Sequence, residues 1–271
     1  MTGFATRYRP FIKRNRLAAQ CGFDLKKLAA LEPLLRVLYE NWWRVQFTGL
    51  QRLPARGSAL IVGNYSGLIP WTALMLIYAL MGNDQNARRV NVMADLDWIA
   101  DERMHSYLRQ IGFVPWSSAN MKKLFAAGEL VAIFPEGLPA TAKPFAERNR
   151  VREFDWTKFL PAIEEAVEIF PLATYGCDQS VPNFFNFDKL SKFLSMPAFP
   201  VSPFFPWLPF PINLATVPVK WSMVLKKSTE YEPHSNRDDL EDTAKRHARF
   251  LEGEIQAELN RIHRTKVKSY I

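Results

Sequence analysis

The chain has 271 residues, and 48% of them are hydrophobic, which suits one globular domain and excludes a disordered chain. Its formal net charge of +8 favours an anionic partner. Because the basic residues crowd the start of the chain, beside an aromatic-rich body without a nucleic-acid-binding motif, we expect that partner to be a membrane surface and not nucleic acid.

Residues 1–45 are expected to form a basic helical element that contacts the membrane. A helix is predicted over residues 28–45, where apolar side chains recur at helical spacing. Two interpretations stay open for Trp42 and Trp43, which belong either to the core or to a lipid headgroup layer. Residues 46–271 would then form the main domain. The basic residues early in the element are Arg7, Arg9, Lys13, Arg14, Arg16, Lys26 and Lys27.

The chain carries no recognisable sorting or spanning segment. No apolar stretch with a cleavage site follows the basic start, so no signal peptide is predicted. The most apolar run, residues 68–81, is too short to span a bilayer and indicates a buried helix. Cys21 and Cys177 have no metal-like or redox-like spacing, which is typical of a reducing compartment. We therefore expect a cytoplasmic protein, peripheral at the inner face of the membrane, with no cofactor.

Short apolar runs, typical of buried strands, alternate with segments of helical period. Such alternation predicts an α/β fold with a mixed, mostly parallel sheet wrapped by helices. The last helix should pack its apolar stripe on the sheet and leave Glu254 and Glu258 in solvent. The expected strands cover residues 58–63, 89–94, 112–115, 130–134, 168–175 and 220–225. The expected helices after residue 45 cover residues 70–81, 101–110, 119–127, 156–167 and 239–264.

Residues 197–211 alternate proline with phenylalanine, tryptophan and leucine. Proline excludes a regular helix or a central strand there. The segment is either a loop packed by its own rings or an exposed apolar lip that contacts a bilayer. In the second case this lip, the basic start and Trp42 with Trp43 would together bring the protein to anionic membranes.

Two motifs follow predicted strands. Residues 63–72 (GNYSGLIPWT) come after the first strand, and residues 134–137 (FPEG) come at the end of the strand over 130–134. Open α/β sheets place ligands at the carboxyl ends of their strands. A pocket is therefore expected between the two turns, although a Glu-Gly turn alone is common.

Together these motifs resemble the phospholipid and glycerol acyltransferase family, in the branch near the diacylglycerol acyltransferases. The first motif of that branch is Asn-His-Ser-Gly-x-x-Pro-x-Asp, and its FPEG stretch ends in Lys-Pro-Phe, as residues 143–145 do here. Residues 169–173 (IFPLA) and 199–208 are similar to two later motifs. The resemblance implies the glycerolipid acyltransferase fold, with an apolar acyl tunnel walled partly by the helix after residue 70. The residues in register with the first motif are Asn64, Ser66, Gly67 and Pro70.

The polar catalytic residues of the family are replaced in this chain. In the family, the histidine takes the proton of the acceptor hydroxyl, the aspartate orients that histidine, and the hydroxyl attacks an acyl thioester. Tyr65 stands at the histidine position. Thr72 stands at the aspartate position in this branch's register, and Pro70 does so in the shorter one. Pro139 replaces the arginine that would hold the acceptor, and Glu136 alone remains as a candidate catalytic residue.

A phenol is a poor base at pH 7, because its ordinary pKa is about 10. His105 is the histidine nearest to the middle of the sheet in sequence, and it is either a substitute base or an ordinary packing or solvated side chain. Arg148, Arg150 and Arg152 either replace the lost arginine as anion holders or belong to a solvated loop.

Two functions stay open. The replaced residues favour a non-catalytic member of the family that binds acyl chains or lipids at the membrane surface, as a carrier, a sensor or a partner of another enzyme. The alternative is an active acyltransferase that moves an acyl group from acyl-CoA or acyl-carrier protein to a lipid or alcohol hydroxyl, with an unconventional base or by proximity alone. In both cases the resemblance implies a binding site made of Asn64, Ser66, Gly67, Glu136, Gly137 and Lys143.

Overall fold

The computed structural model describes residues 22–82, 87–97, 99, 101–196, 198–209, 215–229 and 237–268. Most of the basic start and Cys21 lie outside the described residues, and so does His234. Nothing about the expected membrane contact of residues 1–21 is therefore tested by the structure.

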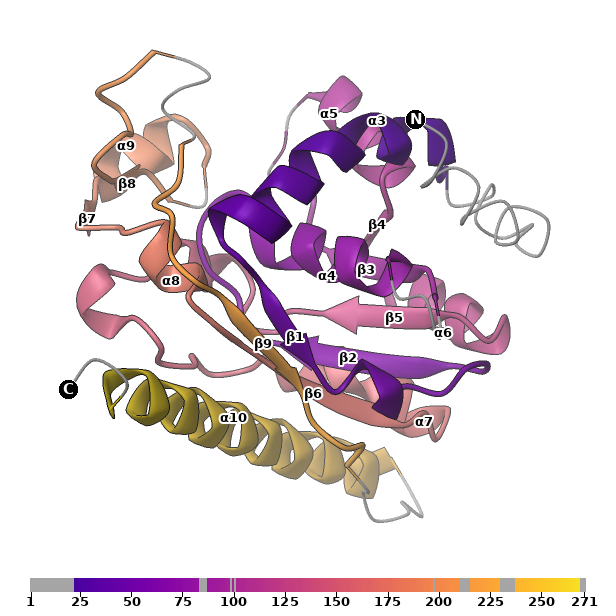
Figure 1. Ribbon diagram of the computed structural model, residues 1–271. Helices are drawn as coiled ribbons and strands as arrows, with labels where there is room; N and C mark the ends of the chain where they lie inside the picture. Colours follow the sequence, from indigo (N-terminus) through magenta and orange to yellow (C-terminus); the bar gives the residue numbers. More distant parts are fainter. Residues whose placement is uncertain are drawn as a thin grey trace.

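A seven-stranded sheet forms the centre of the molecule, in the order β1-β9-β6-β2-β5-β3-β4 (Figure 1). Its neighbours pair in parallel except β6 and β9, which are antiparallel. The strands are β1 Gln46–Thr48, β2 Ala59–Gly63, β3 Val90–Ala94, β4 Phe113–Pro115, β5 Leu130–Ile133, β6 Ile169–Tyr175 and β9 Ser222–Leu225. A separate antiparallel pair joins β7 Phe185–Asn186 to β8 Pro200–Val201.

Helices cover both faces of the sheet. In chain order, the α-helices are α3 Leu25–Arg36, α4 Trp71–Met81, α5 Glu102–Gln110, α6 Ser118–Ala126, α7 Leu160–Glu164, α8 Cys177–Ser180, α9 Asp188–Phe193 and α10 Arg237–Lys268. A π-helical segment, η1 Val37–Trp42, continues α3. Short 3-10 segments are η2 Leu50–Arg52, η3 Leu138–Ala142, η4 Phe145–Glu147 and η5 Trp156–Phe159.

The alternation of side chains along β2 divides the core into two layers. Ala59 and Ile61 pack with α3 and α4 on one face, whereas Leu60 and Val62 pack with α6, α7 and α10 on the other. All five residues of β2 are buried, as expected of a central strand in a parallel sheet covered on both faces. Figure 1 shows α10 below the sheet, and α3 and α4 above it.

The α/β fold expected from the sequence is confirmed, and the six expected strands differ from the observed ones by at most two residues at either end. Strand β1 was not expected. It pairs in parallel with β9, and its three residues carry too little apolar pattern to be identified from the sequence.

The two tryptophans at the end of the first helix have different surroundings. Trp43 is fully buried, and its ring stacks on Trp221 at a centroid distance of 4.5 Å, so it belongs to the core. Trp42 is 40% exposed, and its indole Nε1 donates to the backbone oxygen and the hydroxyl of Thr216. A membrane role is thereby removed for Trp43 and stays a prediction for Trp42.

The proline-rich segment combines the two expected arrangements: one half is a loop packed by its own rings, and the other half is exposed. Phe199 is buried, and its ring lies 4.9 Å from that of Phe205, between centroids. Trp207, by contrast, is 65% exposed. The described part of the segment therefore packs its own rings at one end and presents an apolar side chain to solvent at the other.

Two smaller expectations need correction. The helix over residues 156–167 is shorter, because a 3-10 turn at η5 leads into the five residues of α7. Glu258 was expected in solvent but is only 8% exposed, since it lies in an ion pair with Arg261 on the flank of α10. Within the described ranges, no helix combines the length and the hydropathy that crossing a bilayer requires.

Candidate functional site

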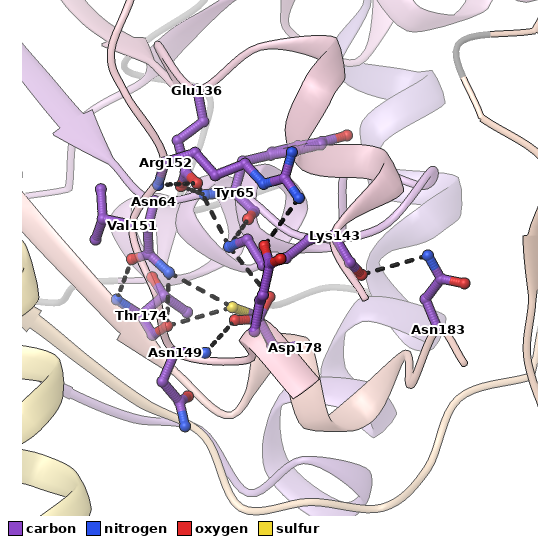
Figure 2. Close-up of polar contacts among 12 residues, drawn as sticks. Asn64, Tyr65, Glu136, Lys143, Asn149, Val151, Arg152, Thr174, Asp178 and Asn183 are labelled. Atoms are coloured by element: carbon purple, nitrogen blue, oxygen red, sulfur yellow. Dashed lines mark hydrogen bonds and ion pairs between the residues drawn. The ribbon is translucent and has the colours of Figure 1, made fainter. Parts of the chain in front are cut away.

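Three loops meet at the carboxyl edge of the sheet, because β2, β5 and β6 are adjacent and parallel. They are the turn after β2 that begins with Asn64, the turn after β5 that carries Glu136, and the junction of β6 with α8 at Cys177 and Asp178. Figure 2 shows Asn64, Glu136 and Asp178 gathered around Lys143.

The Glu136 carboxylate fastens two of these loops together. Its Oε1 accepts from the backbone N–H of Tyr65 at 2.8 Å, and its Oε2 accepts from the backbone N–H of Arg152 at 2.9 Å. The residue is 3% exposed. Burial raises the pKa of Glu136, against the partial opposing effect of Lys143 and of the two backbone N–H groups. Both carboxylate oxygens are thus already occupied by the protein.

Lys143 lies between two buried carboxylates. Its Nζ is 3.4 Å from Oε2 of Glu136 and 3.5 Å from Oδ1 of Asp178, and it also donates to the backbone oxygen of Tyr65 at 3.3 Å. Burial alone would lower the pKa of Lys143, but the charges of Asp178 and Glu136 outweigh it and hold this pKa above its ordinary value. Lys143 is therefore a cation that neutralises the cluster, and it is not a base.

Asn64 extends the pairing of β2 with β6 through its side chain. Its Oδ1 accepts from the backbone N–H of Thr174 at 2.7 Å, and its Nδ2 donates to the backbone oxygen of Thr174 at 3.0 Å. The amide also lies 3.7 Å from the sulfur of Cys177, a buried thiol whose pKa burial raises. Asn64 is 1% exposed, so it holds the turn in place and does not face a ligand in this conformation.

Gly137 allows the turn after Glu136 to fold back. Its backbone angles, φ 62° and ψ −157°, lie in a region that is essentially restricted to glycine. Its N–H bonds to the oxygen of Phe134 at 3.1 Å, which closes the turn. Both residues of the Glu-Gly pair thus have a structural role: the carboxylate of Glu136 accepts two backbone hydrogen bonds, and Gly137 adopts a backbone conformation that other residues avoid.

A large apolar cavity of about 740 Å³ adjoins this cluster. Tyr65, Phe134 and Gly137 line it from the two turns, and α4 contributes Ala73 and Leu74. The cavity is thus located where the motifs place it, between the two turns and against the helix after residue 70. Its size falls within the range of small-molecule sites.

Tyr65, which the sequence resemblance aligns with the family's histidine, lines this cavity. Its ring lies 5.8 Å from that of Phe134, between centroids, and burial raises the pKa of its phenol above the ordinary value of 10.0. Pro70 lines the same cavity, directly before α4. Thr72 is fully buried inside α4, and its hydroxyl has no hydrogen-bond partner among the described residues. Neither candidate position for the aspartate carries a carboxylate.

Three further predicted site residues belong to a second, smaller pocket of about 80 Å³, which shares Leu68 and Ile69 with the cavity. Ser66, Gly67 and Lys143 line it, together with Asp178 and Asn183. Asp178 and Asn183 were not identified from the sequence, because the short helix α8 and the loop after it carry no recognisable motif. The position of Asp178 just after a parallel strand was the one available signal.

His105 adjoins the cavity wall, because its neighbour Met104 and its hydrogen-bond partner Ile99 both line the cavity, but its own side chain takes no part in the lining. Its Nε2 lies 2.7 Å from the backbone oxygen of Ile99, and His105 is not among the described residues that line the cavity. The arginines after the FPEG turn hold local contacts: Arg148 lies over the Phe145 ring, and Arg152 pairs with Glu147 at 3.0 Å. Both observations agree with structural roles for these side chains.

Charged groups do occur on the cavity wall. Asp95 follows β3, and its Oδ2 lies 2.7 Å from Nζ of Lys158. Asp101 also lines the cavity, where it caps the start of α5 by accepting from two backbone N–H groups. These are the carboxylates on the wall within the described part of the chain.

Comparison with known proteins identifies relatives of the chain. Residues 44–175 match the family model described as acyltransferase. Two uncharacterized proteins, one from Mycobacterium tuberculosis and one from Mycobacterium leprae, are each 32% identical to the chain, over 203 and 195 residues. These alignments cover 74% and 71% of this chain, and 56% and 53% of the relatives. The chain thus spans about half the length of the curated relatives it matches.

A solved structure has a similar fold. The 1-acyl-sn-glycerophosphate acyltransferase PlsC from Thermotoga maritima superposes with a TM-score of 0.54, and the match covers 87% of this chain and 79% of that one. The sequences are 14% identical, so the likeness concerns the fold alone.

Proposed function

The chain belongs to the phospholipid and glycerol acyltransferase family, and we propose that it binds an acyl chain at a membrane surface without transferring it. The observation that carries the proposal is Tyr65, which faces the cavity at the position of the family's base. Transfer to a hydroxyl requires that a group accept the hydroxyl proton as the oxygen attacks the thioester carbonyl. A phenol whose pKa burial has raised remains protonated at pH 7 and cannot accept it.

The cavity itself supports acyl binding. Its lining is dominated by aliphatic and aromatic side chains of α3, α4 and α5, and its volume of about 740 Å³ lies within the range of sites that hold small organic ligands. Burial of apolar surface alone contributes about 0.8 kcal/mol of favourable binding free energy for each CH₂ group of the acyl chain. Binding energy is therefore present without the catalytic pair.

Glu136 acts in this proposal as a positioning residue. Its two oxygens hold the backbone of Tyr65 and Arg152, and it is not among the described residues that line the cavity. Asn64 and Lys143 serve the same purpose from β2 and from the loop after η3. The retained motif residues thus keep the shape of the site, and the replaced ones remove its chemistry.

Acyl transfer with another base is the second candidate, because one cavity carboxylate is suitably placed for it. Asp95 lines the cavity that Tyr65 faces, at the carboxyl end of β3. Its Oδ2 lies 2.7 Å from Nζ of Lys158, and a carboxylate is a group that can accept a hydroxyl proton. In this case, Asp95→Asn would abolish turnover.

One experiment separates the two candidates. The full chain is incubated with radiolabelled palmitoyl-CoA and a panel of lysophospholipids, diacylglycerol and simple alcohols, and bound label and transferred label are measured in the same samples. We expect saturable binding and no transferred label in the wild type. Transfer that Asp95→Asn removes would establish the second candidate, and absence of binding would overturn both.

A further inference from the structure

The mouth of the apolar cavity can be located from side chains that both line it and reach solvent. Leu34 on α3 is 50% exposed, Met104 on α5 is 48% exposed, and Leu194 directly after α9 is 45% exposed. All three line the cavity. We call these three residues the mouth rim. Because they come from three separate elements, the opening is enclosed by apolar side chains on several sides.

The apolar surface continues outward from the rim. Val37, three positions after Leu34, is 53% exposed, and Phe193, beside Leu194, is 83% exposed. Further exposed rings surround α9 and the β7–β8 pair, and in Figure 1 this part lies on the same side of the sheet as α3 and α5, away from α10. We call this set the α9 apolar surface, and its members are Phe184, Phe185, Phe187, Leu190, Phe193 and Trp207.

Single exposed leucines need no explanation, but a contiguous apolar surface marks an interaction site. Phe193 is nearly fully exposed, although an aromatic ring of its size is normally buried or paired. Phe185 and Phe187 contact each other, with ring centroids 5.0 Å apart, but packing within the chain does not account for the exposure of Phe193.

The elements around the mouth are basic. Helices α3, α5 and α9 together carry seven basic side chains against three acidic ones. Lys189 and Lys192 lie within α9 itself. Rings flanked by lysines are the composition that lies in the headgroup layer of an anionic bilayer.

We propose that the mouth rim and the α9 apolar surface dock on an anionic lipid bilayer, so that acyl chains pass from the membrane into the cavity without crossing water. Continuity of the surface with the cavity favours a bilayer over a protein partner. A protein docked on the mouth would close the cavity, whereas a bilayer supplies lipid acyl chains, which match the apolar lining of the cavity. The inference rests on the proposed function in that the cavity holds an acyl chain, and it does not depend on whether the chain is transferred.

The test is co-sedimentation of the full chain with mixed phosphatidylcholine and phosphatidylglycerol vesicles. Phe193→Asp should lower the partition coefficient of the protein onto vesicles about tenfold or more, because it replaces an apolar ring in the lipid headgroup layer by a charge. Since the side chain is in solvent, folding should not change, and the melting temperature checks this. Wild-type binding should also weaken at high salt, by screening of the lysines.

Phe250→Asp is the matched control. Phe250 is 51% exposed on α10, which packs on the other face of the sheet from α3 and α4. We expect the Phe250→Asp variant to bind the vesicles with the same partition coefficient as the wild type. Equal binding of the Phe193 variant and the wild type, or no vesicle binding by the wild type, would overturn the proposal.

A soluble probe separates this inference from the proposed function. Binding of a fluorescent short-chain fatty acid, measured without vesicles, should be the same in the wild type and in the Phe193→Asp variant. Probe binding without vesicle binding in the wild type would overturn the docking surface alone. No probe binding would overturn the proposed function. If sedimentation without vesicles gives a dimer that Phe193→Asp splits, the partner is a second copy and the bilayer proposal is wrong.

Discussion

The two sides of the turn at residues 64–70 differ sharply in chemistry. On one side, Asn64, Glu136 and Lys143 are buried, and hydrogen bonds and ion pairs to three neighbouring loops engage their polar groups. On the other side, Tyr65 and Pro70 face an apolar cavity. The side chains that hold the backbone in place thus lie on the first side, and Tyr65, which we propose to stand at the position of the family's base, lies on the second.

The strongest prediction concerns the polar side. Lys143→Met leaves the carboxylates of Glu136 and Asp178 buried near each other without a cation, so the free energy of unfolding should fall by about 3–5 kcal/mol. Urea unfolding followed by circular dichroism measures this.

Lys122→Met provides the comparison for that variant. Lys122 also pairs with a glutamate, Glu164, but both side chains are well exposed, at 42% and 35%. Exposed pairs contribute about 0–1 kcal/mol. An equal loss of unfolding free energy in Lys143→Met and Lys122→Met would contradict the structural role given to the buried cluster.

Asn64→Ala should have the next largest effect. It removes both hydrogen bonds to the backbone of Thr174 and leaves those groups buried, so a loss of about 1–3 kcal/mol of unfolding free energy is expected. Urea unfolding again measures it. A change below about 0.5 kcal/mol would mean that the side chain does not join β2 to β6 in solution.

On the cavity side, a substitution that fills the cavity should lower the affinity for an acyl chain more than it lowers the free energy of unfolding. Leu108→Trp on α5 adds volume to the wall, and the affinity for the fluorescent short-chain fatty acid should fall about tenfold. Leu190→Trp is the control, since Leu190 is exposed on α9 and is not among the described cavity residues. A titration that gives the same affinity for both variants would place the acyl chain elsewhere.

Tyr65→Phe should have the smallest effect. The phenol oxygen makes no hydrogen bond to the described part of the chain, so its removal should change the free energy of unfolding by less than about 0.5 kcal/mol. Thermal and urea unfolding check this. A loss comparable to that of Asn64→Ala would show that the cavity side of the turn is structural too.

The order of the elements could be predicted because each buried strand is a short apolar run that ends in a motif or a turn. Strand β1 could not, since its three residues are mostly exposed and are fixed only by pairing with β9. Trp42 and Trp43 could not be separated, because the π-helical segment η1 changes the angular spacing that helical periodicity assumes.

The site was predicted less completely than the fold. Glu136 and Gly137 were identified because one motif contains both. Asp178 was missed because its role depends on Lys143, which lies far from it in sequence and reaches it through the pairing of β2 with both β5 and β6. Of the α9 apolar surface, the sequence indicated only Trp207, within the proline-rich segment; the other side chains were missed because they come from short segments that carry no periodicity.

The central claim is that the site has lost its base and kept its shape. The most direct test measures transfer of radiolabelled acyl groups by the wild type and by the double variants Tyr65→His/Thr72→Asp and Tyr65→His/Pro70→Asp, which restore the pair in either register. The account predicts no turnover by the wild type and measurable turnover by at least one double variant. Wild-type turnover, or two folded and acyl-binding variants that remain inactive, would contradict it.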